Sequence, residues 1–263
     1  MKLVLVLALL VVLSACAFAD VTMRYPQKET VKAGGTLAAG AVSRGETFDL
    51  AFSDNSGKSY AWSSLVISQD SLPSGWQVVS TSVNDTSLVA KIRVPSFASP
   101  GAYPLQVKLS NAQGASESVV AAVALRENLL DVSFSRESSN ITKVGDTVTY
   151  KAVITNNSIA PETVVLSSNL PSNWFAERKI ELKPNSSQEV ELTVRPLTSG
   201  NHAFAFSAYS VQKGSVVKSF SSELKVQPTL KGKLSSMFSG FPIFTFTLLP
   251  FQLFDAYISL LFY

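Results

Sequence analysis

An internal repeat of roughly one hundred residues constrains the fold of this chain more than any other feature of its sequence. Three pairs of short segments recur in the same order and at nearly the same spacing: residues 45–48 and 145–148, 72–76 and 170–174, and 99–103 and 198–202. The second pair is the most alike, because Leu-Pro-Ser-Gly-Trp is matched by Leu-Pro-Ser-Asn-Trp. Three matches in register are expected from two copies of one domain in tandem.

Each copy has the residue pattern of a β-sandwich. Apolar residues recur at every second position in residues 89–94, 103–109, 147–154 and 189–194, which is the period of a half-buried strand. Clusters of Asn, Ser, Gly and Pro interrupt these runs, and no helical period of useful length is found in residues 20–226. Short strands separated by such turns predict an all-β fold with two tandem sandwiches and argue against a βαβ arrangement.

The motifs of the second copy, residues 144–207, resemble a known family. Their order is Gly-Asp-Thr, a strand, Asn-Asn, Leu-Pro-x-x-Trp, a Pro-x-Ser turn, an alternating strand and Ser-Gly. This order resembles the immunoglobulin-like domain associated with α-galactosidases and with many archaeal and bacterial surface proteins, and is similar to the cell-adhesion-related domain. The first copy matches loosely, since it lacks the Asn-Asn turn and has an insertion at 54–62. The resemblance implies immunoglobulin-like β-sandwiches and says more about fold than about function.

The repeat and the two apolar ends divide the chain into five predicted parts. They are a signal peptide at 1–19, sandwiches at 20–126 and 127–227, a linker at 228–240 and a membrane segment at 241–263. The net charge is +3, and the surplus comes mainly from Lys2, Lys231 and Lys233, which flank the apolar ends. The sandwiches are thus nearly neutral, so we expect no nucleic-acid partner.

The N-terminus predicts export through a signal helix. Lys2 precedes an apolar run at residues 3–13 that is too short to span a bilayer, and small residues follow it. Ala17-Phe18-Ala19 offers a cleavage site before Asp20, whereas residues 13–16 resemble the bacterial lipobox, in which Cys16 would be lipidated. Both forms of processing remain open. Because Cys16 is the one cysteine in the chain, the sandwiches are held by core burial without a disulfide.

The C-terminal segment from Phe241 to Tyr263 predicts membrane attachment. It is apolar, rich in aromatic residues and long enough to span with some tilt, with Asp255 as its single charge. Pro250 interrupts a helix, and Asp255 is costly in hydrocarbon unless it lies near an interface or is paired. Spanning, lying in one leaflet and contacting a partner helix are the alternatives. The exported domains are expected to face outside.

No motif in the sequence nominates a catalytic, metal or cofactor site. The chain has one histidine, His202, which occupies the repeat position of Tyr103 and is expected to be an ordinary strand residue. No Cys/His cluster has metal-ligand spacing, and no glycine-rich phosphate loop is present. We therefore expect a protein that is not an enzyme and has no cofactor.

Four aromatic residues are candidates for contact with a ligand or partner. Trp76 and Trp174 could stack on sugars, but their recurrence at equivalent positions favours a structural role in each sandwich. Tyr60 and Trp62 lie in the insertion of the first copy and have no counterpart in the second. We therefore predict Tyr60 and Trp62 as the candidate contact surface.

Four asparagines begin Asn-x-Ser/Thr sequons and are candidate glycosylation sites: Asn84, Asn140, Asn156 and Asn185. All four are expected in turns. Whether they carry glycans depends on the organism.

Together these features predict a non-enzymatic, membrane-anchored protein of the cell envelope. Its two immunoglobulin-like domains would serve adhesion, surface structure or the binding of a protein or carbohydrate partner. The alternative is an accessory subunit of an envelope secretion or carbohydrate-processing complex, docked through its C-terminal helix. The two differ in their dependence on Asp255, which a docking helix would need and a simple anchor would not.

Overall fold

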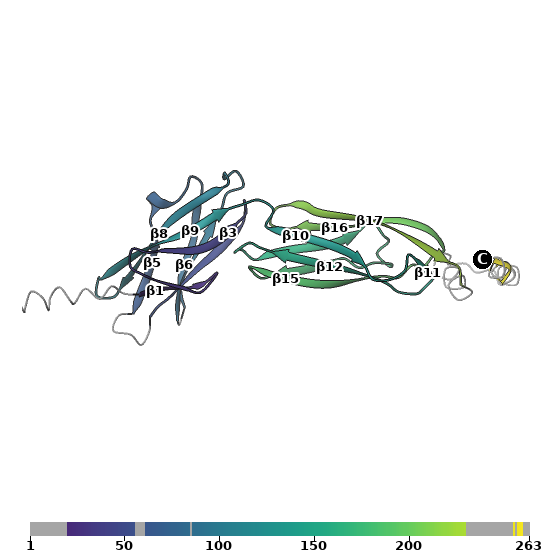
Figure 1. The fold of residues 1–263 in the computed structure, drawn as a ribbon, viewed down its shortest axis with the longest axis horizontal. Coiled ribbons are helices and arrows are strands. Elements are labelled where there is room, and N and C mark those ends of the chain that lie inside the picture. Colours follow the sequence, from purple (N-terminus) through teal and green to yellow (C-terminus); the bar gives the residue numbers. More distant parts are fainter. Residues whose placement is uncertain (1–19, 56–60, 85, 230–254, 256, 260–263) are drawn as a thin grey trace, which may run out of the picture. The chain divides into compact units, whose positions relative to one another are not determined.

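The computed structural model describes residues 20–55, 61–84, 86–229, 255 and 257–259. Most of these residues are in β-strands, labelled β1 to β17, with a 3-10 helix η1 at Gln69–Ser71 (Figure 1). The described residues divide into two compact units. Unit 1 extends to Leu129 and also includes Ser158–Pro161, and unit 2 contains Leu130–Asn157 and the residues from Glu162 onward.

Unit 1 is a sandwich of two sheets, and its strands have the following bounds: β1 Asp20–Tyr25, β2 Glu29–Lys32, β3 Thr36–Val42, β4 Thr47–Ser53, β5 Trp62–Ile67, β6 Gln77–Asn84, β7 Ser87–Arg93, β8 Gly101–Asn111 and β9 Ser116–Leu125. One sheet has the order β2-β1-β4-β7-β6 and the other the order β3-β9-β8-β5. All pairs are antiparallel except β3 with β9. The alternating residues of β4, β7, β8 and β9 point into one core between the sheets.

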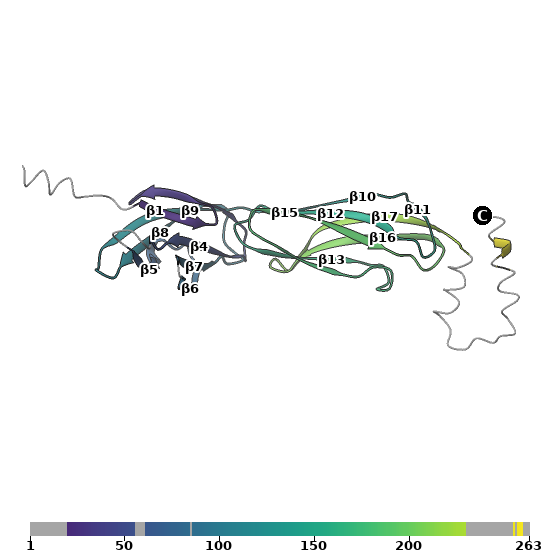
Figure 2. The ribbon, with the colours of Figure 1, turned by 90° about the horizontal axis from the view of Figure 1, so that it is seen from below.

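Unit 2 is a second sandwich with its own core, and its strands have the following bounds: β10 Leu130–Arg136, β11 Ile141–Lys143, β12 Val148–Asn156, β13 Glu162–Ser168, β14 Arg178–Leu182, β15 Ser186–Val194, β16 Gly200–Ser210 and β17 Ser215–Gln227. Its sheets have the orders β10-β12-β15 and β11-β17-β16-β13-β14. Figure 2 labels the strands of the first sheet and all but β14 of the second. The one parallel pair is β11 with β17, which corresponds to β3 with β9. Tyr150, Phe204 and Phe206 pack ring to ring in the core.

The strand that follows each Leu-Pro-x-x-Trp segment differs between the units. In unit 1, β6 begins directly after Trp76 and pairs with β7. In unit 2, three residues separate Trp174 from β14, which pairs with β13 in the opposite sheet. The first of these residues, Phe175, is buried in the core. The two copies thus share one immunoglobulin-like strand order except for this strand and for β2, which has no counterpart among the described strands of unit 2.

Residues 158–161 complete the core of unit 1. Ile159 donates its backbone N–H to the Ala41 carbonyl at 2.8 Å, and both Ile159 and Ala160 are buried. A Cβ atom on Gly40 would lie 2.5 Å from Cγ2 of Ile159, so the absence of a side chain at Gly40 makes room for Ile159. The sequence repeat placed these residues in the second domain and did not indicate that they pack in the core of unit 1.

The predicted signal peptide and most of the predicted membrane segment lie outside the described residues. This holds for Cys16, Phe241 and Pro250, whereas Asp255 lies in a short described helical stretch and is exposed. Over the ranges that the structure describes, no helix is long and apolar enough to cross a membrane. Anchoring therefore stays a prediction from the sequence.

Candidate functional site

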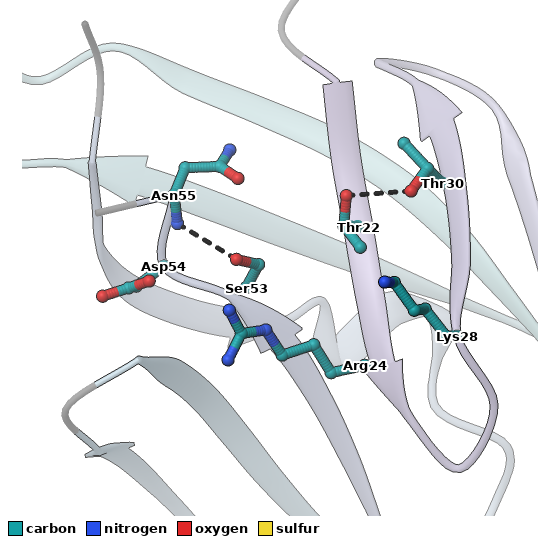
Figure 3. Close-up of a pocket in the computed structure, with 7 residues that line it drawn as sticks. All are labelled: Thr22, Arg24, Lys28, Thr30, Ser53, Asp54 and Asn55. Carbon is teal, nitrogen blue, oxygen red and sulfur yellow. Dashed lines mark hydrogen bonds between the residues drawn. The ribbon is translucent and has the colours of Figure 1, made fainter. Parts of the chain in front are cut away.

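A polar cavity opens on unit 1 at the side of β1 and β2. Its volume is about 600 Å³, and all of its lining residues are polar or charged: Thr22, Arg24, Lys28, Thr30, Ser53, Asp54 and Asn55 (Figure 3). Antiparallel pairing of β1 with both β2 and β4 brings these residues together from three separate segments. Side chains at alternate positions of β1, such as Thr22 and Arg24, point to the same face of the sheet.

Short hydrogen bonds fix the walls of this cavity. The hydroxyls of Thr22 and Thr30 lie 2.9 Å apart across the β1–β2 pair. Asn55 adopts a left-handed backbone with φ of 56°, and its side-chain amide donates to the Asp20 carbonyl at 3.3 Å. The Arg24 guanidinium donates from Nη1 to the Thr86 hydroxyl at 2.9 Å. The wall residues are therefore positioned before any ligand arrives.

The charges in the cavity favour an acidic ligand with hydroxyl groups. Arg24 and Lys28 are exposed cations, and within the described ranges neither forms a salt bridge. Figure 3 shows the Arg24 side chain reaching toward Ser53 and Asp54, with Lys28 on the side of Thr22. A guanidinium and an ammonium donate charge-assisted hydrogen bonds to an anion, while the hydroxyls and the Asp54 carboxylate can accept hydrogen bonds from ligand hydroxyls.

Two ionisable groups outside the cavity have shifted pKa values. Burial and the nearby Asp49 carboxylate raise the pKa of the Tyr25 phenol above its usual value. The hydrogen bond to Glu189 raises the pKa of the Lys151 amino group. Both shifts keep the side chain in its ordinary state near neutral pH, so neither residue is prepared for acid–base catalysis.

Two buried carboxylates stabilise the fold by accepting hydrogen bonds from nearby segments. Glu46 accepts hydrogen bonds from the Ser43 N–H and the Ser158 hydroxyl, and Glu162 accepts them from the Ser210 hydroxyl and the Thr163 N–H. Glu46 belongs to unit 1 and Glu162 to unit 2. Among the residues that the structure describes, no group of His, Cys, Asp and Glu could hold a metal ion.

The predicted contact surface at Tyr60 and Trp62 needs correction. Trp62 is the first residue of β5 and is only 4% exposed, because its indole belongs to the core of unit 1. Its lack of a counterpart in the second copy therefore reflects different core packing. Tyr60 lies outside the described residues.

The candidate glycosylation sites fall in different environments. Asn84 at the end of β6, Asn140 before β11 and Asn185 in the turn before β15 are exposed. Asn156, expected in a turn, is the last residue of β12 and only 1% exposed. Its side-chain amide donates to the Lys183 carbonyl at 3.2 Å, so we correct the prediction for Asn156.

The two repeated tryptophans each pack against a second ring, at equivalent positions of the two units. We call each of these ring pairs, Trp76 with Tyr103 and Trp174 with His202, an aromatic corner. The ring of Trp76 is 5.3 Å from that of Tyr103, whose hydroxyl donates to the Ser99 carbonyl at 2.6 Å. The ring of Trp174 is 4.7 Å from that of His202, whose Nε2 lies 3.2 Å from the carbonyl oxygen of Thr198. Both indoles are buried, which agrees with a structural role.

A smaller cavity of about 250 Å³ lies beside Trp174 in unit 2. It is lined by residues of the Leu-Pro-x-x-Trp segment and the strands next to it: Ser172, Asn173, Trp174, Phe175, Ala176, Arg178 and Thr193. Its only charged group is Arg178. Because Trp174 and Phe175 are buried, they offer little aromatic surface to a ligand.

Sequence reasoning missed the polar cavity of unit 1. Thr22, Arg24 and Thr30 show only the alternation of exposed strand positions, and Ser53 to Asn55 read as a turn. Their meeting depends on the pairing of β1 with β2 and β4, which no local pattern reveals. The nearness of Arg24 and Lys28 in the sequence was the one available signal of a cationic site.

Comparisons with known proteins add little beyond the strand order. No protein-family model and no curated protein sequence matches the chain. Similar solved structures include the D00–D0 domain of intimin, at 14% identity and a TM-score of 0.27, over 78% of this chain and 98% of that one. A chimeric titin Z1Z2 carrying a decorin peptide has 16% identity and a TM-score of 0.36, over 81% and 98%. The immunoglobulin-like assignment therefore rests on the strand order of each unit.

Proposed function

We propose that this chain is a non-enzymatic, membrane-anchored surface protein of the cell envelope whose immunoglobulin-like units bind a partner outside the cell. The polar cavity of unit 1 is the observation that carries the binding role. Export and anchoring rest on the apolar ends of the sequence. The resemblance of residues 144–207 to domains of archaeal and bacterial surface proteins supports the same assignment.

An acidic carbohydrate is the ligand class that best fits the cavity. Arg24 and Lys28 supply two cations, and Thr22, Thr30 and Ser53 supply hydroxyls. Sugar hydroxyls both donate and accept hydrogen bonds, which suits a lining that contains hydroxyls and a carboxylate. The carboxylate of a uronic acid would take the charge-assisted bonds from Arg24 and Lys28.

The test measures binding of an oligogalacturonate to the full-length protein in detergent, with a neutral maltooligosaccharide as the comparison ligand. The double variant Arg24→Gln/Lys28→Gln should weaken oligogalacturonate binding by roughly tenfold or more, since hydrogen bonds to charged groups contribute about 1.5–3 kcal/mol each. The matched control Arg93→Gln/Lys108→Gln removes two exposed charges at the end of β7 and on β8 and should leave binding unchanged. Equal binding by the double variant and the wild type would contradict a role for the cavity.

A further inference from the structure

The exposed apolar side chains of unit 1 gather on one side of its sandwich. Four large ones are more than half exposed: Val66, Val79, Val83 and Phe97. Val66 lies on β5, and Val79 and Val83 lie on β6, the strand next to β5 across the sandwich. The Phe97 ring covers Gly75 at the start of β6, since a Cβ atom there would lie 2.6 Å from Cζ of Phe97.

This side of unit 1 consists of two open sheet edges. Among the described strands, β5 pairs only with β8, and β6 pairs only with β7. The outer N–H and C=O groups of such strands are a template for a further strand, and proteins usually protect them with charges or proline. Neither Trp62–Ile67 nor Gln77–Asn84 contains a charged residue or a proline. Each strand has one bulge, another form of edge protection, but the bulge lies near the first residues and leaves the rest of the strand in regular register.

Two edge strands of unit 2 carry charges. The edge strand β14 carries Arg178, Lys179 and Glu181, and the edge strand β15 carries Glu189 and Glu191. β14 holds the repeat position of β6 but pairs with β13 in the opposite sheet, which leaves β15 at the edge of its own sheet. Both of these edge strands of unit 2 are charged, whereas β6 is not. The uncharged edge of unit 1 therefore needs a specific explanation.

The sequence of β6 fits a second copy of itself. Residues 79–83 read Val-Ser-Thr-Ser-Val, which is the same in both directions. Two antiparallel copies related by a two-fold axis through Thr81 would place Val79 opposite Val83 and Ser80 opposite Ser82 at both ends. Because the strand has no charge, self-pairing brings no like charges together.

We propose that unit 1 self-associates through β6, with two copies pairing antiparallel about Thr81 to form one continuous sheet across the dimer. The exposed Val79 and Val83 side chains form cross-strand pairs in this arrangement, and Phe97 flanks the pair at each end. The bulge at Val79 lies at the end of the palindrome and leaves the central residues in regular register with β7. This proposal is independent of the ligand cavity, whose residues lie on β1, β2 and the end of β4.

Charge variants of the full-length protein in detergent test the pairing by sedimentation. Thr81 is exposed, so Thr81→Lys should fold normally while placing two ammonium groups opposite each other. We expect Thr81→Lys to weaken self-association by roughly tenfold or more, and Thr81→Glu to do the same. A mixture of the two variants should regain the association because each lysine then faces a glutamate. The matched control Gln188→Lys adds the same charge to the exposed edge strand β15 of unit 2 and should associate like the wild type.

A cysteine at the two-fold axis tests the register. Directly opposed residues in an antiparallel pair have Cα atoms about 4.5–5.5 Å apart, which suits a disulfide. Thr81→Cys should therefore cross-link to itself under mild oxidation, and Gln188→Cys should not. A wild-type protein that stays monomeric would overturn the proposal. So would association that Thr81→Lys does not weaken, or capture of β6 by a different protein with no cross-link between copies.

Discussion

At the residue scale, the aromatic corner accommodates a tyrosine in one unit and a histidine in the other with the same packing. Tyr103 and His202 stand at the same repeat position, and each packs on the tryptophan of its own unit. Each also places a polar atom, the Tyr103 hydroxyl or the His202 Nε2, against the carbonyl of the residue four positions earlier. The histidine is therefore explained by structure, as a tyrosine substitute that closes the turn before β16.

The corner hydrogen bonds should contribute measurably to stability. Tyr103→Phe keeps the ring on Trp76 but removes the bond to Ser99, so we expect the free energy of unfolding of unit 1 to fall by about 0.5–1.5 kcal/mol. His202→Phe should have a similar effect on unit 2. Hydrogen exchange, read separately for β8 and β16, measures both changes. Tyr209→Phe, at an exposed tyrosine, is the control; an equal loss in that variant would refute a special role for the corner.

The sequons make a second prediction at the residue scale. In a host that attaches N-linked glycans, Asn140 and Asn185 should be occupied and Asn156 should not, because the Asn156 amide is buried and bonded to Lys183. Asn84 should be occupied on the monomer, since it is exposed at the end of β6. Glycopeptide mass spectrometry of the purified protein measures each occupancy. Full occupancy of Asn156 would mean that the end of β12 is more open than the structure shows.

At the element scale, the repeat and the alternation predicted most of the fold. The runs at 89–94, 103–109, 147–154 and 189–194 all lie within or largely within strands, and both repeated tryptophans are buried. The sheet partner of the strand after each tryptophan could not be predicted. β6 and β14 occupy the same place in the repeat, and their choice of sheet depends on the spacing after the tryptophan and on the burial of Phe175.

The candidate site was harder to predict than the fold. Trp62 was assigned to a surface because it has no counterpart in the second copy, yet an unmatched aromatic residue can also fill a core. The polar cavity needs β1 to lie between β2 and β4, and this pairing joins residues that are distant in the sequence. Local patterns report which face a residue occupies, but they do not report which strands become neighbours.

Residues 158–161 yield a test at the element scale. Ile159 fills a space in unit 1 above Gly40, so Ile159→Ala should leave a cavity and lower the stability of unit 1 by about 2–5 kcal/mol. Hydrogen exchange should show faster exchange in β3 and β4, with little change in β15 and β16. Val211→Ala removes exposed apolar atoms and should change neither unit. Unaltered protection of β3 in Ile159→Ala would show that the segment does not support unit 1.

At the scale of the whole molecule, the chain has two immunoglobulin-like units followed by a segment that the sequence predicts to be an anchor. The polar cavity and the β6 edge of unit 1 are surface features suited to binding. To bind a partner outside the cell, the units must be exported and then retained at the membrane. Export and retention depend on the two ends of the chain, which the sequence alone describes.

The energy of inserting the C-terminal segment favours retention. Burying about eight Phe, Leu or Ile side chains, at about 1.5–3 kcal/mol each, gives roughly 12 kcal/mol or more. Placing Asp255 in the membrane costs about 3 kcal/mol on insertion scales, and the prolines cost a few more. Apolar burial should therefore exceed these costs, and the tail alone should hold the protein.

Carbonate extraction of membranes from cells making the full chain or the chain without residues 234–263 tests this claim most directly. The full chain should remain in the membrane pellet, with its folded units accessible to protease on intact cells. The shortened chain should be released as a soluble, folded two-unit protein. Cys16→Ser, included in the same experiment, should be retained like the wild type with Asp20 as its first residue. A shortened chain that stays in the pellet, or a Cys16→Ser variant that is lost from it, would contradict anchoring by the tail.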